Sequence, residues 1–553
     1  MRPWLFAAAF SLWAVLAGAV PPALGASGPV TPDWRVCMAE TSVTSDMVIK
    51  SCTAIIKSSR EPKAKLAIAY YQRGTAYRVE GRMDRAIQDY DQAIELDPKY
   101  VIAYNDRGTA YTQKAQPNRA IQSLDQAIRL DPKLASAYNN RGTAYSLKGE
   151  LEQAIRDYDQ AIRLDPKYAF ALHNRGNAYR ILGELDRAIR DFDLAIKYEP
   201  RYVLAYNNRG GTYSSKGDLE RARQDYDHAI RLVPADPAAY NNRGLLYARK
   251  GDLDRAIQDY DRAIQLDPNM ALAYNNRGNA YSSKGMAEQA VQDYNQAILL
   301  DPSYAFAFNN RGNAFRNLGD VRRALADFDQ AIRIAPNYAL AYNNRGNTYT
   351  SLGELDQAIH DYDQAIRLSP NLAMAYSNRG NAYSNKGELD RAIQDYDQAI
   401  RLNPKDVTAY DNRGLAHTRK GDLDRAILDF DQAIALRPND ASAWNSRCFA
   451  RGLAGYLEPA LSDCNEALRL RPEDTNSLDS RGFVFLKLGQ IDQAIADYDA
   501  ALRQDPKKAH TLYGRGLAKR RKADFAGAEA DIATASAISP RIAEQYRGYS
   551  IPP

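Results

Sequence analysis

The stretch that decides the fold is 135–168, ASAYNNRGTAYSLKGELEQAIRDYDQAIRLDPKY, because the chain repeats it fourteen times with small changes. An arginine series with a constant step of 34 residues runs from Arg73 to Arg515. The same step separates the prolines that close the units: Pro98, Pro132, Pro166, Pro200, Pro234, Pro268, Pro302, Pro336, Pro370, Pro404, Pro438, Pro472, Pro506 and Pro540. A fixed period of this length predicts a solenoid of stacked repeats. Fourteen units would cover 67–542 of the 553 residues.

Each unit has the pattern of two short helices joined by a tight turn. In 135–168, Tyr138, Gly142 and Tyr145 share one face of a first predicted helix, and a second apolar face follows around Tyr158. Gly149 lies between them, where a helix end favours a left-handed residue. The two units without this glycine have Ala115 and Ala523. One such hairpin cannot bury both of its faces, so neighbouring hairpins are expected to stack.

The repeated pattern resembles the tetratricopeptide repeat. The family's places are occupied here by Tyr138, Arg141-Gly142, Tyr145, Ala154, Tyr158, Ala161 and Pro166. This resemblance implies an all-α fold, a right-handed superhelical solenoid of stacked helical hairpins whose first helices line a concave side. One departure is systematic, because the family's usual leucine before the glycine is arginine in all fourteen units.

The arginine has an acidic counterpart on the second helix. Aspartate stands at the place of Asp157 in thirteen units, and Ser123 is the exception. We expect Arg141 and Asp157, and their equivalents, to pair across each hairpin. The alternative is an arginine that is solvated at the rim, and an exposed pair would contribute only ~0.2–1 kcal/mol.

The N-terminal segment 1–26 is predicted to be a signal peptide. A short basic start precedes an uncharged run from Trp4 to Val20, which Pro21-Pro22 and several small residues end. The sequence therefore predicts an exported protein, located in the periplasm or cell envelope if the source is bacterial. The alternative is an uncleaved membrane anchor, because 4–26 is long enough to span a bilayer. After cleavage we expect no membrane span.

The two ends of the array differ from the regular units. Residues 33–66 are predicted to form a degenerate N-terminal capping hairpin, since terminal repeats are usually atypical. Residues 543–553 form a short C-terminal tail, and 542–549 are expected to make a partial cap.

The four cysteines fall at equivalent places of these hairpins. Cys448 stands where other units have the first-helix glycine, and Cys464 stands where they have the second-helix tyrosine. In the degenerate first hairpin, Cys52 has the second-helix place and Cys37 lies near the first-helix place. The pattern favours two disulfides, Cys37–Cys52 and Cys448–Cys464, which an exported protein allows. Four cysteines permit three connectivities, and two reduced pairs are the alternative.

A row of asparagines precedes the arginine series in nine consecutive units. These residues are Asn140, Asn174, Asn208, Asn242, Asn276, Asn310, Asn344, Asn378 and Asn412. A second set lies one helical turn further on: Asn177, Asn279, Asn313, Asn347 and Asn381. The arrangement resembles the asparagine ladder of O-linked N-acetylglucosamine transferase, which grips a substrate or partner chain. Asparagine amides can donate to and accept from a peptide backbone, so both sets are predicted peptide-binding residues. The alternative is that they bond only to each other and to neighbouring backbone.

No constellation for catalysis or metal binding stands out. The five histidines occupy different places of different units, and nothing after residue 542 could hold a catalytic domain like that of the transferase. A net charge of +5 from mixed charges does not resemble a nucleic-acid binder. We therefore expect no enzyme activity, no cofactor and no metal.

The predicted function is a non-catalytic protein–protein interaction scaffold that binds an extended peptide segment in a concave groove. An alternative is a substrate-selecting or regulatory subunit of an enzyme or of a secretion or envelope assembly complex. A structural spacer is a third class.

Overall fold

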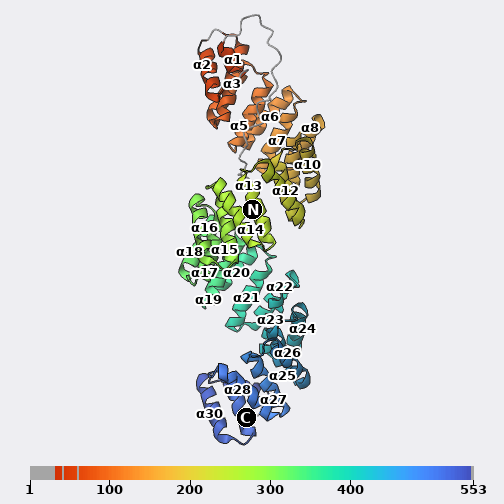
Figure 1. Ribbon diagram of the computed structural model, residues 1–553, viewed down its shortest axis with the longest axis vertical. Helices are drawn as coiled ribbons and strands as arrows, with labels where there is room; N and C mark the ends of the chain where they lie inside the picture. The colour runs from red at the N-terminus through yellow and green to blue at the C-terminus, as the bar shows by residue number, and fades with distance from the viewer. Residues whose placement is uncertain (1–31, 40–42, 59–60, 550–553) are drawn as a thin grey trace. The chain divides into compact units, whose positions relative to one another are not determined.

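The computed structural model describes residues 32–39, 43–58 and 61–549. The predicted signal peptide, 1–26, lies outside these ranges, as do the last residues of the predicted C-terminal tail. All regular secondary structure within the described ranges is α-helical, and the helices follow one another as antiparallel pairs (Figure 1). The prediction of an all-helical stack of hairpins is therefore confirmed. None of the described helices combines the length and apolar character that crossing a membrane requires.

The chain divides into two compact units, which end and begin at Ala273 and Tyr274. In the first unit, the first helices of the hairpins are α3 (Lys63–Val79), α5 (Val101–Gln113), α7 (Ala135–Lys148), α9 (Ala169–Ile181), α11 (Val203–Ser215) and α13 (Pro237–Arg249). Their second helices are α4 (Met83–Leu96), α6 (Pro117–Leu130), α8 (Leu151–Leu164), α10 (Leu185–Tyr198), α12 (Leu219–Leu232) and α14 (Leu253–Leu266).

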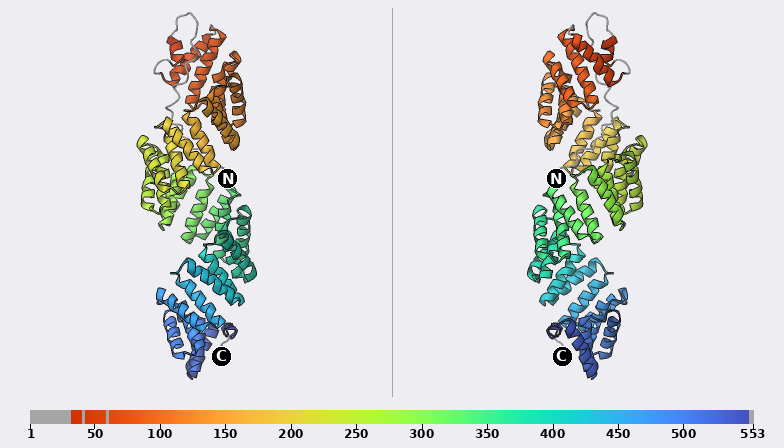
Figure 2. Two further views of the ribbon diagram at one scale, coloured as in Figure 1. Left: turned by 90° about the vertical axis from the view of Figure 1, so that its right-hand side faces the viewer. Right: turned by 90° about the vertical axis from the view of Figure 1, so that its left-hand side faces the viewer.

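The second unit continues with the same alternation, which Figure 2 shows from two sides. Its first helices are α15 (Ala271–Ser283), α17 (Ala305–Asn317), α19 (Ala339–Ser351), α21 (Ala373–Lys386), α23 (Val407–Lys420), α25 (Ala441–Ala454), α27 (Thr475–Leu488) and α29 (Ala509–Arg521). Its second helices are α16 (Ala287–Leu300), α18 (Val321–Ile334), α20 (Leu355–Leu368), α22 (Leu389–Leu402), α24 (Leu423–Leu436), α26 (Leu457–Leu470), α28 (Ile491–Gln504) and α30 (Phe525–Ile538).

The first helices lie on the inner side of each stack. In the first unit α5 contacts α7 and α7 contacts α9, and in the second α17 contacts α19 and α19 contacts α21. Among the described residues, the backbones of consecutive second helices do not come as close to each other as those of these first helices do. First helices are thus closer together than second helices, so each stack curves toward them. The inner face of the array, as used below, is the solvent-facing side of these first helices.

The tight turn within each hairpin depends on a left-handed residue. The predicted glycines have positive φ, for example 82° at Gly149 and 77° at Gly353. Ala115 and Ala523 take the same conformation, with φ of 56° and 67°, although a side chain disfavours it.

The core of a hairpin is a close contact between a glycine and an aromatic ring. A Cβ atom at Gly142 would lie only 2.7 Å from Cε1 of Tyr158. Tyr158 is buried and packs with Ala154 and Ala178, the latter from the next hairpin. The repeated first-helix glycine therefore allows the two helices to approach each other.

The ends of the array have their own caps. At the N-terminus, α1 (Pro32–Cys37) and α2 (Ser45–Ser58) occupy most of the predicted capping hairpin, and Trp34, Cys37 and Cys52 are buried there. At the C-terminus, α31 (Ile542–Gly548) buries Ile542 and Tyr546 against the last hairpins.

Candidate functional site

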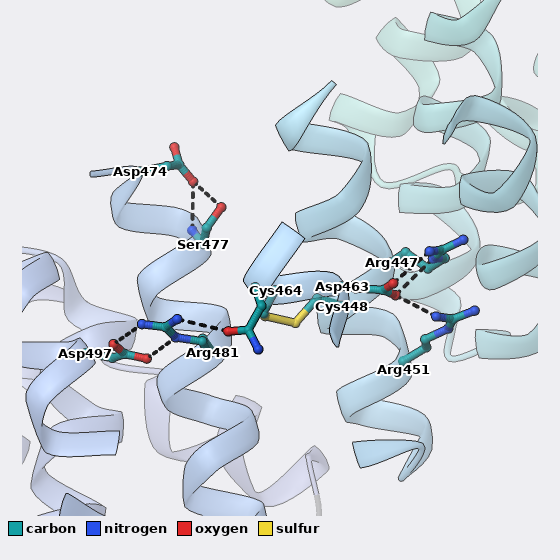
Figure 3. Close-up of a disulfide and its surroundings, with 10 residues drawn as sticks. Arg447, Cys448, Arg451, Asp463, Cys464, Asp474, Ser477, Arg481 and Asp497 are labelled. Atoms are coloured by element: carbon teal, nitrogen blue, oxygen red, sulfur yellow. Dashed lines mark hydrogen bonds and ion pairs between the residues drawn. A yellow bond between two sulfur atoms is a disulfide. The ribbon is translucent and has the colours of Figure 1, made fainter. Parts of the chain in front are cut away.

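The cysteines pair as the sequence predicts. Cys37 bonds to Cys52 with their Cα atoms 4.9 Å apart, and Cys448 bonds to Cys464 with their Cα atoms 5.4 Å apart. All four side chains are fully buried. Figure 3 shows the second disulfide beside the ion pair of Arg447. Each disulfide thus joins the two helices of one hairpin near one end of the array.

The repeated arginine binds the buried aspartate of its own hairpin through two hydrogen bonds. Arg141 donates from Nε to Oδ2 of Asp157 at 2.8 Å and from Nη2 to Oδ1 at 2.7 Å. The Asp157 side chain is 9% exposed, so the pair is more buried than a rim pair. The same two bonds recur in neighbouring hairpins, for example between Arg175 and Asp191. The predicted pairing across the hairpin is present, and solvation of the arginine at the rim is not what the structure shows.

The same arginine also reaches back to the preceding hairpin, which the sequence analysis missed. Nη1 of Arg141 donates to Oδ1 of Asp125 at 2.7 Å. Arg175 bonds in the same way to Asp159 at 2.7 Å. Both arginines therefore have partners 16 residues before and 16 residues after them, and this regular spacing was the available signal. We call this three-bond arrangement the arginine bridge. It connects consecutive second helices through the first helix that lies between them.

These contacts shift the pKa of the bridging arginine. In the bridge of Arg345, the hydrogen bonds to Asp361 raise the pKa of the guanidinium, although its burial acts in the opposite direction. In the unit that has Ser123 in place of the buried aspartate, Arg107 donates to the hydroxyl of Ser123 at 3.0 Å instead. Arg107 still reaches Asp91 of the preceding hairpin at 2.5 Å.

The asparagine row lies half-buried along the inner face, and its amides connect adjacent first helices. The side chain of Asn344 donates to Oδ1 of Asn309 at 2.9 Å, and that of Asn378 donates to Oδ1 of Asn343 at 3.0 Å. In the first unit, Asn174 donates to Asn139 at 3.0 Å. Three further members have the same kind of bond: Asn140 to Asn105, Asn310 to Asn275 and Asn208 to His173. Asn412 differs, because it donates to Asn381 at 2.9 Å. Asn242 and Asn276 are also half-buried, on α13 and α15.

Members of the second asparagine set accept hydrogen bonds both from the row and from tyrosines. Asn279 accepts from Asn310 at 3.0 Å, and Asn381 accepts from Asn412. Asn347 and Asn381 each accept a hydrogen bond from the buried tyrosine of their own hairpin, at 2.7 Å from Tyr362 and Tyr396. Asn279 accepts similarly from the hydroxyl of Tyr294 at 2.8 Å. Asn177 accepts from Arg180, whereas Oδ1 of Asn313 is buried without a hydrogen-bond partner among the described residues.

His173 stands at the place of Asn139, the residue just before each member of the row. It is 6% exposed, and its Nε2 accepts from the amide nitrogen of Asn208 at 2.7 Å. Its Nδ1 lies 3.1 Å from the hydroxyl of Tyr202. Burial lowers the pKa of His173 to about 4, so the imidazole is neutral at physiological pH. His173 therefore serves the row as a neutral hydrogen-bonding partner of Asn208.

Comparisons with known protein families match the repeats. Models described as TPR repeat match 110–149, 176–217, 210–251, 246–285, 346–387 and 482–522. Models described as tetratricopeptide repeat match 67–100, 135–168, 271–304, 305–338 and 373–406, then 89–122, 157–190 and 328–360, and finally 407–440. Together the matches run without a gap from 67 to 440. Among functionally curated proteins, no sequence matches the chain significantly.

Several solved structures are similar to the chain. The APC/C hetero-tetramer Cut9–Hcn1 has a chain that aligns with a TM-score of 0.54 at 17% identity, covering 86% of this chain and 93% of that one. A tetratricopeptide repeat protein from Parabacteroides merdae aligns over 45% of this chain and 98% of its own at 22% identity, with a TM-score of 0.39. MamA covers 29% of this chain and 95% of its own at 31% identity, with a TM-score of 0.27. The first of these similarities supports the fold alone.

Proposed function

The chain belongs to the tetratricopeptide repeat family, and we propose that it binds an extended segment of a partner protein along the inner face. Repeats of this family generally serve as scaffolds for protein–protein interaction. The finer proposal is that the asparagine row holds the partner's backbone, in a way similar to the asparagine ladder of O-linked N-acetylglucosamine transferase.

The hydrogen-bonding capacity that remains on Asn344 carries this proposal, whereas Asn310 already donates to both Asn275 and Asn279. A carboxamide has two N–H donors and two acceptor lone pairs. Asn344 uses one donor toward Asn309 and accepts one bond from Asn343 at 3.4 Å. One N–H and one lone pair are therefore left for a ligand, and these match the C=O and N–H of a peptide bond. The bonds within the row hold each amide in a fixed orientation, which lowers the entropy lost on binding.

The cellular compartment is part of the same proposal. Two buried disulfides favour an oxidising environment. This supports export to the periplasm or cell envelope of a bacterium, with the N-terminal segment as the export signal.

Selection of displayed random peptides on the full chain tests the proposal. The selected peptides are then measured by fluorescence anisotropy against a triple variant of the row, Asn310→Ala, Asn344→Ala and Asn378→Ala. A matched control removes three exposed amides from second helices, Gln289→Ala, Gln357→Ala and Gln493→Ala. Circular dichroism establishes that both variants keep their helical content.

The proposal predicts at least about tenfold weaker binding by the asparagine variant, because two or more hydrogen bonds of ~0.5–1.5 kcal/mol each are lost. The glutamine variant should bind like the native chain. Equal affinities for the native chain and the folded asparagine variant would show that the row is purely structural, and failure to select any peptide would favour a spacer.

A further inference from the structure

We propose that the partner segment carries apolar side chains at alternate positions, and that these dock on a row formed by Phe306, Leu340 and Met374. We call these three residues the apolar row. The inference rests on the proposed function, because it assumes an extended segment on the inner face, and it adds the chemical class of that segment.

The apolar row consists of large side chains that the fold leaves exposed. Phe306 is 46% exposed, Leu340 38% and Met374 49%. They stand at the same place of three consecutive units, near the start of α17, α19 and α21. The first unit has the same feature at Phe170 and Leu204, which are 44% and 37% exposed. Their recurrence at a 34-residue step, on the inner rather than the packed side of the helix, indicates a surface available to a partner.

The apolar row lies beside the asparagine row. Phe306 precedes Asn310 by four residues, as Leu340 precedes Asn344 and Met374 precedes Asn378, and residues four apart lie next to each other on a helix. The thioether of Met374 is 3.8 Å from the side-chain nitrogen of Asn343, a residue that also bonds to Asn378. A backbone held by the asparagines would therefore place side chains over the apolar row. Since side chains of an extended chain alternate between two sides, every second residue would face it.

The inner face of these three helices carries little charge, which suits an uncharged apolar segment. Arg311, Arg345 and Arg379 are engaged in arginine bridges with buried aspartates. Lys386 pairs with Asp356 of a second helix. Arg316 is the remaining basic residue on these helices, and burial lowers the pKa of its guanidinium.

The chain's own C-terminal segment packs on the inner face of the last hairpins. Tyr549, just after α31, packs on the rings of Phe449 and Phe483, with centroids 5.7 Å apart in both cases. Phe449 and Phe483 stand at the same place of their units as Asn313 and Asn347, on the inner face. At the end of the array an aromatic side chain from another segment therefore covers this face. The apolar row is a partly exposed surface, in which the ring of Phe306 also packs against Tyr338 with centroids 4.8 Å apart.

Three labelled synthetic peptides and the full chain test the inference by fluorescence anisotropy. The first peptide alternates Leu with Ser over ten residues. The second has the same composition with all leucines in one block, and the third replaces every Leu by Asn. We expect the alternating peptide to bind at least about tenfold more tightly than either of the others, since partial burial of several leucine side chains exceeds a factor of ten.

The variant Phe306→Ser, Leu340→Ser and Met374→Ser should remove this preference while the chain stays folded, because these side chains are exposed. A control variant, Leu299→Ser with Leu428→Ser, changes leucines of second helices that are 72% and 63% exposed, and should keep the preference. Equal binding of all three peptides, abolished by the asparagine triple variant, would overturn the apolar preference and leave the backbone-binding function intact. Binding of none of the peptides would overturn both proposals.

Discussion

The arginine bridge leads to an asymmetric prediction for Arg345 and Asp361. The guanidinium of Arg345 donates to both oxygens of Asp361, at 2.7 and 2.6 Å, and to Asp329 at 2.6 Å. The Asp361 side chain is 2% exposed, whereas that of Arg345 is 19% exposed. Replacing the arginine by alanine would therefore leave a carboxylate in the interior without its two donors.

The magnitudes of the two single changes differ. Removing one partner of a buried ion pair costs about 3–5 kcal/mol, and we expect this for Arg345→Ala. Asp361→Ser should cost only ~1 kcal/mol, because Arg345 keeps Asp329 and some solvent. The chain already contains this combination, since Arg107 binds Ser123 and Asp91.

Hydrogen–deuterium exchange of the full chain is the suitable assay, since an array of repeats need not unfold in one step. Amides of α19 and α20 should lose far more protection in Arg345→Ala than in Asp361→Ser. Arg469→Ala, which removes an exposed pair with Glu466, serves as the control and should leave protection unchanged. An equal or larger loss in Asp361→Ser would refute the assignment of the aspartate as the buried, dependent partner.

Three further predictions concern stability. Between pH 6.5 and about 4, an unfolded histidine binds a proton that buried His173 does not bind, so the native chain loses stability as the pH falls. The variant His173→Asn should lessen this loss of stability by up to ~3 kcal/mol, as measured by urea titrations at pH 7.5 and 4.5. The double variant Cys448→Ala with Cys464→Ala opens a loop of 16 residues and should destabilise the last hairpins by ~3 kcal/mol in exchange experiments. The buried disulfide of the native chain should resist mild reductant. Ala115→Gly should stabilise its turn by ~1 kcal/mol, because φ there is 56°; a lower thermal midpoint would contradict this.

Much of the fold could be predicted because every 34-residue unit shows the same pattern of residues. The 34-residue step, the glycines before each second helix and the Arg141–Asp157 spacing depend on geometry within one hairpin. Cys37–Cys52 and Cys448–Cys464 followed from the same register. The third bond of the bridge, from Arg141 to Asp125, requires the placement of one hairpin against the next, which a single unit does not encode.

The candidate site was predicted less completely, for a related reason. The sequence identified the asparagine row, but the bond from Asn344 to Asn309 depends on the approach of two first helices. The apolar row was missed because Phe306, Leu340 and Met374 resemble core residues in composition, and only their exposure distinguishes them. The sequence predicted a partial cap over 542–549, but the packing of Tyr546 on Tyr549 lies outside the repeat register, so no periodic pattern could indicate it.

The central claim, that asparagine side chains hold a partner's backbone, is tested most directly by an amide-to-ester change in the bound peptide. A peptide selected on the native chain is compared with analogues in which one backbone N–H at a time is replaced by an ester oxygen, on the native chain and on Asn344→Ala. The account predicts that one such ester weakens binding to the native chain about tenfold and has little further effect on the variant, because both changes remove the same hydrogen bond. Fully additive losses at every ester position would contradict it.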